Sequence, residues 1–283
     1  MVRFSALALV ICLGCGESTP ADPDGGPVAM PLSCGVEPCD FVISALRVPR
    51  VDAAGRVIGV DLDDHVSDET SPRSCGHADF VAPDGTMGVD NQFVEMVPTL
   101  EAALGTPVAD ARDTSIANGT FLFGLTLASD GSDPAISVRA GSLAVADGTE
   151  PQLDASGGLL ASQPFVWEDA PMEGEATLID GVLDASIGDV EVTWPFDETT
   201  EIEIPVSTAH IVVPVVDREP GIGVLVGRID IDELIRAGGM TDPSDLLRRT
   251  LEERADLDPD SEGVCQAISI AVEVELVRAR IDR

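Results

Sequence analysis

The chain has 283 residues, enough for one large all-β domain or two small ones, and 44% of them are hydrophobic, as in a globular protein. Acidic residues outnumber Lys and Arg by 51 to 16, and the net charge of −35 repels phosphate backbones and anionic lipid head groups, so we do not expect nucleic acid as a partner. All 16 of these basic residues are Arg, and a chain without Lys has neither a Schiff-base nucleophile nor a P-loop.

Residues 1–14 predict a signal peptide. Arg3 precedes an apolar run over residues 4–14, which is too short to span a bilayer as a helix. The run ends in the sequence CLGC, which places the small residue Gly14 directly before Cys15, and a polar stretch rich in Pro and Gly follows. This order of segments is typical of an exported chain.

The same N-terminus resembles the signal of bacterial lipoproteins, in which a lipobox directs cleavage before a cysteine and attachment of lipid to it. The resemblance implies a lipid on Cys15, a flexible tether over residues 15–33, and a place in the cell envelope, at the outer membrane or the cell surface. The membrane would then be a partner only through this lipid. The alternative is an ordinary secretory signal without lipid.

Four cysteines remain after the signal peptide and the lipidated residue. An even number in an exported chain predicts two disulfides, for which three pairings exist. Cys34 and Cys39 are close enough in sequence to close a small loop, and that pairing leaves Cys75 to join Cys265.

Alternating apolar and polar residues, many of them β-branched, predict strands along most of residues 34–283, with Asp-Gly, Gly-Gly and Pro-Gly turns between them. Helical spacing appears at 92–104, 231–237 and 243–255. We therefore expect a single, mainly β domain, sandwich-like or barrel-like, with one or two packed helices. The predicted strands are 41–48, 56–62, 120–128, 135–145, 159–167, 175–179, 182–196, 202–216, 222–231 and 264–281.

The densest run of polar and special residues is CGHADFVAPDGTMGVDNQF at 75–93. Its second half offers hard oxygen ligands between glycines that permit a tight loop, which is what calcium requires, and acids upstream would complete the shell. The alternative is turn chemistry, because Pro-Asp-Gly forms turns and Asp-Asn caps the following helix. The candidate calcium ligands are Asp61, Asp63, Asp84, Asp90 and Asn91.

The first half of the run contains Cys75, His77 and Asp79, whose spacing of two would place them on one side of an extended segment, as zinc ligands require. We favour a structural interpretation, because an exported cysteine is expected to be oxidised and a disulfide sulfur does not bind zinc.

The common catalytic motifs G-x-S-x-G and H-E-x-x-H, the P-loop and the dinucleotide fingerprint are missing from the sequence. A pair of acids suited to glycoside hydrolysis stays open, because acids occur throughout the chain. Trp167 and Trp194 lie in predicted strands, where they would either stack on sugar rings or belong to the core.

The chain as a whole, with its run CGHADF…PDG…GVDNQ, also resembles uncharacterised predicted surface lipoproteins of high-GC bacteria, a resemblance that implies no activity. Our first hypothesis is a structural or binding role at the cell envelope, with a protein or glycan as ligand. One alternative is a secreted hydrolase, such as a carbohydrate-active one, that uses an acidic pair. The other is a calcium-stabilised module that binds carbohydrate or protein.

Overall fold

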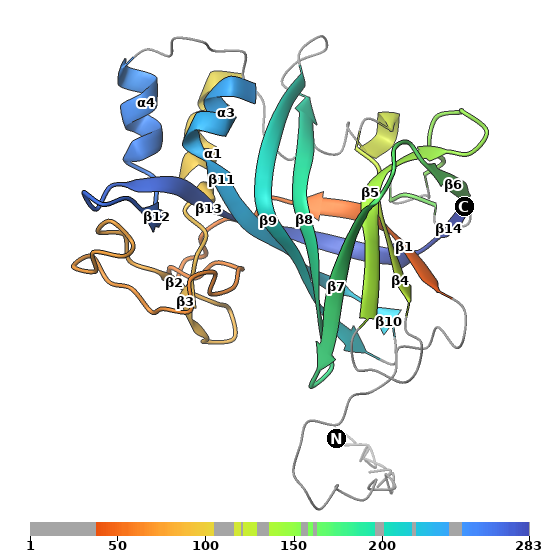
Figure 1. Ribbon diagram of the computed structural model, residues 1–283, viewed down its shortest axis with the longest axis horizontal. Coiled ribbons are helices and arrows are strands. Elements are labelled where there is room, and N and C mark those ends of the chain that lie inside the picture. The colour runs from red at the N-terminus through yellow and green to blue at the C-terminus, as the bar shows by residue number, and fades with distance from the viewer. Residues whose placement is uncertain are drawn as a thin grey trace, which may run out of the picture.

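Eight antiparallel strands close into a barrel in the computed structural model of the chain (Figure 1). Each strand pairs with the next barrel strand along the chain, and the last pairs back with the first. Because the number of strands is even, the closing pair is antiparallel like the others, and closure leaves little of the sheet edge unpaired. The barrel strands are β1 (Cys39–Arg47), β4 (Phe123–Ala128), β5 (Ile136–Val145), β7 (Met172–Ile179), β8 (Val182–Pro195), β9 (Glu201–Val216), β11 (Ile222–Asp230) and β13 (Cys265–Arg278).

The barrel-like form of the predicted β domain is thereby confirmed. The predicted signal peptide, the lipidation site Cys15 and Cys34 lie outside the described residues, so the interpretations placed on them stay predictions. The structure describes residues 38–104, 116–119, 121–128, 136–153, 158–160, 163–195, 201–216, 219–237 and 245–282.

The inward face of the barrel is a packed apolar core. Leu183 and Ala185 of β8 stand opposite Val213 and Ile211 of β9, and all four side chains have no exposed surface. Burial of a Leu or Ile side chain contributes about 1.5–3 kcal/mol, so the alternating pattern of these strands both sets their register and stabilises the closed sheet.

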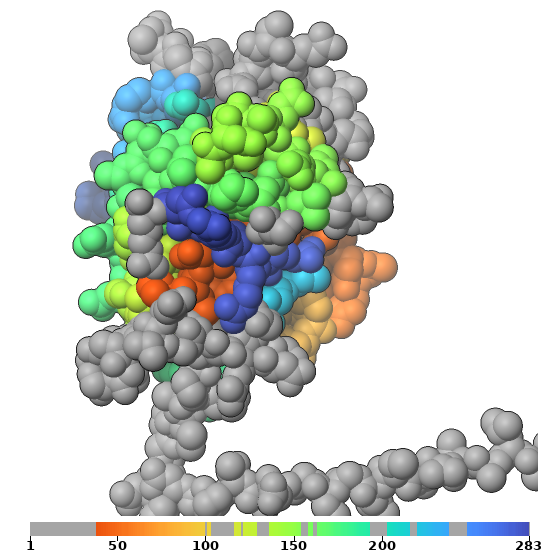
Figure 2. All heavy atoms as spheres, turned by 90° about the vertical axis from the view of Figure 1, so that its right-hand side faces the viewer, coloured from red at the N-terminus to blue at the C-terminus, as the bar shows by residue number. Residues whose placement is uncertain are grey.

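A second layer covers part of the outer barrel face. Strand β6 (Pro164–Trp167) pairs with the end of β5, and β14 (Arg280–Asp282) lies parallel to β6. Figure 2 shows the C-terminal residues in dark blue, between the green segments above and the red start of β1 below. Phe165 and Ile281 are buried in this layer. A side chain at Gly124 would come within 2.5 Å of Leu143, which explains why glycine occupies that position of β4.

Three helices flank one end of the barrel: α1 (Phe93–Leu104), α3 (Ile231–Ala237) and α4 (Asp245–Glu252) (Figure 1). Each falls within a predicted helical segment, and Pro98 lies inside α1. The short strands β10 (Glu219–Pro220) and β12 (Leu257–Pro259) extend the sheet beside β9 and β13.

Residues 48–92, between β1 and α1, form a segment that we call the cap (Figure 1). It contains the short hairpin of β2 (Phe80–Val81) and β3 (Met87–Val89). The predicted strand at 56–62 is wrong, because residues 56 and 60 form only isolated bridges there. The bridges join this segment to residues 81 and 90 of the cap. Its buried apolar residue Val57 packs in the small apolar cluster of the cap rather than in the barrel sheet.

The cap covers an edge that the barrel leaves open. Pairing between β1 and β13 ends at Glu273, so the first half of β13 has no β1 neighbour. The Asn91 side chain takes the place of a strand there: its amide nitrogen donates to the Ala271 carbonyl at 3.1 Å, and its oxygen accepts from the Ala271 N–H at 3.1 Å. The Gln92 N–H donates to the Ser269 hydroxyl at 2.8 Å. These bonds satisfy backbone groups that would otherwise be buried without partners.

Candidate functional site

Three carboxylates converge within the cap. Asp61, Asp63 and Asp90 each present one oxygen, and these oxygens lie within 4.8 Å of one another. All three are among the predicted calcium ligands. We call them the Asp61–Asp63–Asp90 cluster.

Local backbone pairing brings the cluster together. The Asp90 N–H donates to the Val60 carbonyl at 2.9 Å, and the Leu62 N–H donates to the Asp90 carboxylate at 2.6 Å. Asp61 and Asp63 flank Leu62 in sequence, so this pairing sets both beside Asp90. Residues 61–65 then turn, with the His65 N–H donating to the Asp61 carboxylate at 3.0 Å.

Gly88 has a positive φ of 83°, and a side chain there would come within 3.0 Å of the Asp61 carboxylate. Glycine adopts this conformation at little cost and leaves room for the carboxylate to approach. The glycine that the sequence places inside the predicted calcium loop therefore shapes the cluster rather than a turn alone.

Burial dominates the electrostatics of the cluster. Asp90 is only 4% exposed, and burial raises its pKa to about 8; the Leu62 N–H opposes this shift, while repulsion from Asp256, Asp79 and Asp63 adds to it. Burial also raises the pKa of Asp63, and the neighbouring Asp61 adds to the effect. A buried carboxyl group surrounded by carboxylates stays protonated unless a cation compensates its negative charge.

Asp63 also carries an unsatisfied atom. Its Oδ1 is buried and has no hydrogen-bond partner within the described part of the chain. A buried polar atom without a partner is unusual in a folded protein and points to a missing proton, water or ion. The donors gathered here are hard carboxylate oxygens, which suit calcium, magnesium or manganese better than softer metals.

Two further acids adjoin the cluster. Asp79 is in hydrogen-bonding contact with Asp90, and its pKa is raised by burial and by the Asp63 and Asp61 carboxylates. Asp256 is 3% exposed, and burial raises its pKa to about 7 although the Ser269 N–H and hydroxyl donate to it at 2.8 and 2.6 Å. The sequence does not place Asp256 beside Asp90, because only the fold brings residue 256 to residue 90.

The other two predicted calcium ligands lie outside the cluster. Asp84 is exposed beside the β2–β3 turn, where its carboxylate accepts the Thr86 N–H at 2.9 Å. That hydrogen bond lowers the pKa of Asp84. Asn91 is fully buried, and its amide is bonded to backbone groups of Ile58 and Ala271. Asp84 therefore follows the alternative of turn chemistry. The Asn91 side chain follows neither expectation, because it bonds to the barrel edge rather than to the start of the helix.

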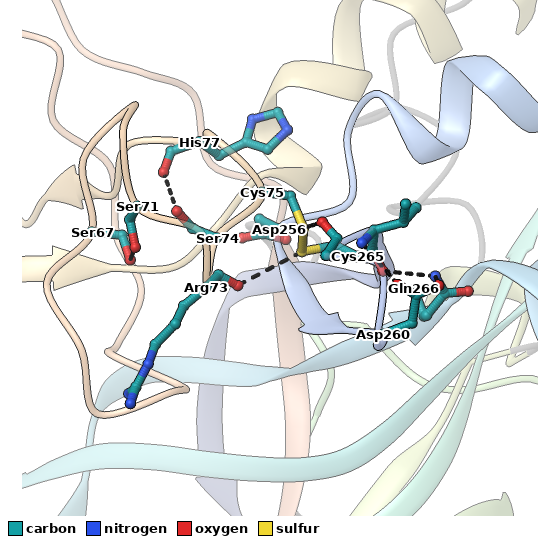
Figure 3. Close-up of a disulfide and its surroundings, with 12 residues drawn as sticks. Ser67, Ser71, Arg73, Ser74, Cys75, His77, Asp256, Asp260, Cys265 and Gln266 are labelled. Atoms are coloured by element: carbon teal, nitrogen blue, oxygen red, sulfur yellow. Dashed lines mark hydrogen bonds between the residues drawn. A yellow bond between two sulfur atoms is a disulfide. The ribbon is translucent and has the colours of Figure 1, made fainter.

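The predicted disulfide between Cys75 and Cys265 is confirmed, and it joins the cap to the start of β13 (Figure 3). Cys75 is thus not a zinc ligand. His77 is half-buried, and burial together with the charge of Arg254 lowers its pKa. Figure 3 shows the His77 ring turned away from the disulfide, in accord with the structural interpretation of this triplet. Cys39 is also disulfide-bonded, and the predicted pairing with Cys34 falls outside the described residues.

The two tryptophans stay untested as a sugar-binding surface. Trp167 lies in β6, half-buried, with the Arg139 guanidinium 5.9 Å from its ring centre. Its indole Nε1 is buried and has no partner in the described residues. The backbone of Trp194 lies in β8, and its side chain is outside the described part of the structure.

A cavity of about 300 Å³ lies beside the cluster, between the cap and the outer surface of the barrel. Asp63 lines it together with residues of β9, β11 and β12. Asp63 therefore belongs to both the cluster and the cavity.

Comparison of the chain with protein-family models, with curated proteins and with solved structures found no match. Among the described residues, none of the helices has the length and apolar character needed to cross a membrane.

Proposed function

We propose that this chain is an exported, lipid-anchored binding protein of the cell envelope whose cap is organised by a bound calcium ion. The observation that carries the proposal is the convergence of the Asp61–Asp63–Asp90 cluster, in which Asp63 has a buried oxygen without a partner in the described residues. Cys15 and its lipobox support the anchor, and only the sequence supports it.

Electrostatics favours a cation at this place. Two ionised carboxylates whose oxygens lie within 4.8 Å of each other repel by about 3 kcal/mol or more at an effective dielectric constant near 20. A divalent ion between Asp63 and Asp90 would replace this repulsion with attraction, and it would offer a ligand bond to the Asp63 oxygen that has no partner among the described residues. Calcium takes six to eight oxygens, so backbone carbonyls and water would complete its shell.

A cation there would also fix the cap. Asp61 and Asp63 belong to one loop and Asp90 to the end of the β2–β3 hairpin, so an ion bound by all three would tie these segments together. The same hairpin continues into Asn91, which holds the edge of β13. Calcium would therefore stabilise the surface that the cap presents for binding.

Thermal unfolding of the chain from residue 16 onward, with calcium, with magnesium and with chelator, tests the proposal. We expect the unfolding midpoint to rise with calcium and the rise to disappear in the double variant Asp63→Asn/Asp90→Asn. Asp84→Asn is the matched control, since Asp84 lies in the same hairpin but outside the cluster, and it should keep the calcium response. An equal rise in the wild type and the double variant would refute the assignment.

The hydrolase hypothesis has one observation in its favour. Asp79 and Asp90 lie in contact, and burial keeps Asp90 protonated near neutral pH, as a general acid requires. Turnover on a panel of glycans that is lost on Asp79→Asn, with the fold retained, would favour this function over calcium-dependent binding.

A further inference from the structure

The cavity between the cap and the barrel is lined by an unusual set of charges for this protein. Two arginines line it, Arg73 from the cap and Arg228 from β11, although the chain has only 16 arginines against 51 acidic residues. Asp63 and Asp258 complete the charged lining. A cavity of about 300 Å³ is at the lower end of the range for small-molecule sites.

Both arginines have side-chain N–H groups that make no hydrogen bond to any residue in the described part of the chain. Nη1 of Arg228 donates to both oxygens of Asp258, at 2.9 and 2.7 Å, whereas its Nε and Nη2 make no hydrogen bond within the described part of the chain. The Arg73 guanidinium makes no ion pair or hydrogen bond with any described residue, and its charge acts on Asp63. Figure 3 shows the Arg73 side chain extending away from the Cys75–Cys265 disulfide, which fixes its backbone.

The backbone around the cavity is distorted. Thr208 and Asp258 both line the cavity and have positive φ values of 47° and 56°. This conformation is rare for a β-branched residue such as Thr208. The Thr208 N–H is held by the Asp189 carboxylate at 3.0 Å. The pairing of β11 with β9 is irregular between Val226 and Arg228, and such irregularities redirect side chains next to functional sites.

We propose that this cavity binds a small organic anion, a carboxylate or phosphate of about the size of a sugar acid, through Arg73, Arg228 and the calcium ion at the Asp61–Asp63–Asp90 cluster. The inference rests on the proposed calcium site. Without calcium, Asp63 would repel an anion in the cavity; with calcium, the same wall attracts it. The planar guanidinium fork suits two oxygens of one carboxylate or phosphate, a geometry that Lys would not supply.

Isothermal titration of the exported chain tests the proposal, with D-glucuronate, inorganic phosphate and neutral D-glucose as probes, each with calcium and with chelator. Calcium binding is measured separately in the same protein. We expect one of the two anions to bind the calcium-loaded chain and glucose not to bind. Chelator should weaken the binding of that anion. Comparison of glucuronate with phosphate identifies which anion the cavity prefers, and preference for either one supports the proposal.

Substitution separates the arginines from the calcium site. In Arg73→Gln and in Arg228→Gln, anion affinity should fall by about tenfold or more, the loss expected for a hydrogen bond to a charged group, while calcium affinity is retained. Arg228→Lys keeps the charge that pairs with Asp258 and should also lose affinity, because it lacks the fork. Arg280→Gln, at an exposed arginine of β14, is the control and should behave like the wild type.

The outcomes distinguish the two proposals. If the chain binds calcium but neither anion, the anion site is refuted and the calcium site is retained. Absence of calcium binding would remove the calcium site, and anion binding unchanged by chelator would show that calcium takes no part. Anion affinity unchanged in both arginine variants, or equal binding of glucose and glucuronate, would also overturn the inference.

Discussion

Replacing Asp90 by Asn removes a buried carboxyl while keeping its size and an oxygen that can accept the Leu62 N–H. Asp90 is 4% exposed, and its pKa of about 8 compares with an ordinary value of 3.8. Between these two values the folded chain holds a proton that the unfolded chain has lost. The free energy of unfolding therefore falls as pH rises through this window, by about 1.4 kcal/mol per pH unit for one group.

At pH 7 this fall amounts to about 4 kcal/mol relative to pH 4, because pH 7 lies about three units above the ordinary pKa. The Asp90→Asn variant has no titrating proton at this position and would escape the fall. In chelator-treated protein at pH 4, we expect the free energy of unfolding of Asp90→Asn to equal that of the wild type or to lie slightly below it. At pH 7 we expect it to exceed the wild-type value by up to about 4 kcal/mol.

Urea unfolding followed by tryptophan fluorescence at several pH values between 4 and 8 provides the measurement. Asp84→Asn is the control: backbone hydrogen bonding lowers the pKa of Asp84, so its contribution is present above the ordinary pKa and is lost as pH falls, the opposite sign. A difference between Asp90→Asn and the wild type that stays constant from pH 4 to pH 8 would refute the argument that burial keeps Asp90 protonated.

Three other predictions concern separate parts of the chain. The double change Cys75→Ser/Cys265→Ser opens a disulfide with a sequence separation of 190 and should lower the free energy of unfolding in urea by up to about 5 kcal/mol on the chain-entropy model; a loss near zero would contradict it. Gly88→Ala places a methyl group against Asp61 at a position with positive φ, so we expect the free energy of unfolding in urea to fall by about 1 kcal/mol or more. Calcium titration should also show weaker binding, and unchanged values in both measurements would contradict the role of Gly88. Cys15→Ser should release the protein from the membrane fraction, as measured by fractionation and mass spectrometry for lipid, and a variant that stays membrane-bound would contradict the anchor.

Local pattern predicted the barrel strands because each has a recognisable pattern of its own, either an apolar run as in β4 or an alternation of buried and exposed residues as in β7. The predicted ranges 182–196 and 202–216 correspond closely to β8 (Val182–Pro195) and β9 (Glu201–Val216). Closure was beyond such reasoning, because β1 pairs with β13 across more than 200 residues and no local feature names that partner. The segment 56–62 has a comparable apolar pattern but pairs with its neighbours only through isolated bridges at residues 56 and 60, so it forms a loop.

The site followed the same division. The run of oxygen ligands between glycines predicted Asp90, the acids upstream of it predicted Asp61 and Asp63, and the structure brings these three together. Asp84 shows the same residue type, but its Pro-Asp-Gly context forms a turn that points it to solvent. Asp256 became a neighbour of Asp90 only because β12 pairs with β13 beside the cap.

Equilibrium dialysis of the chain against calcium, with the bound metal counted, is the decisive test of the calcium site. We expect one calcium per chain in the wild type and none in a variant with Asp61, Asp63 and Asp90 all changed to Asn, while the circular dichroism of the barrel is retained. A wild type that binds no calcium, or a variant that binds as much as the wild type, would contradict it.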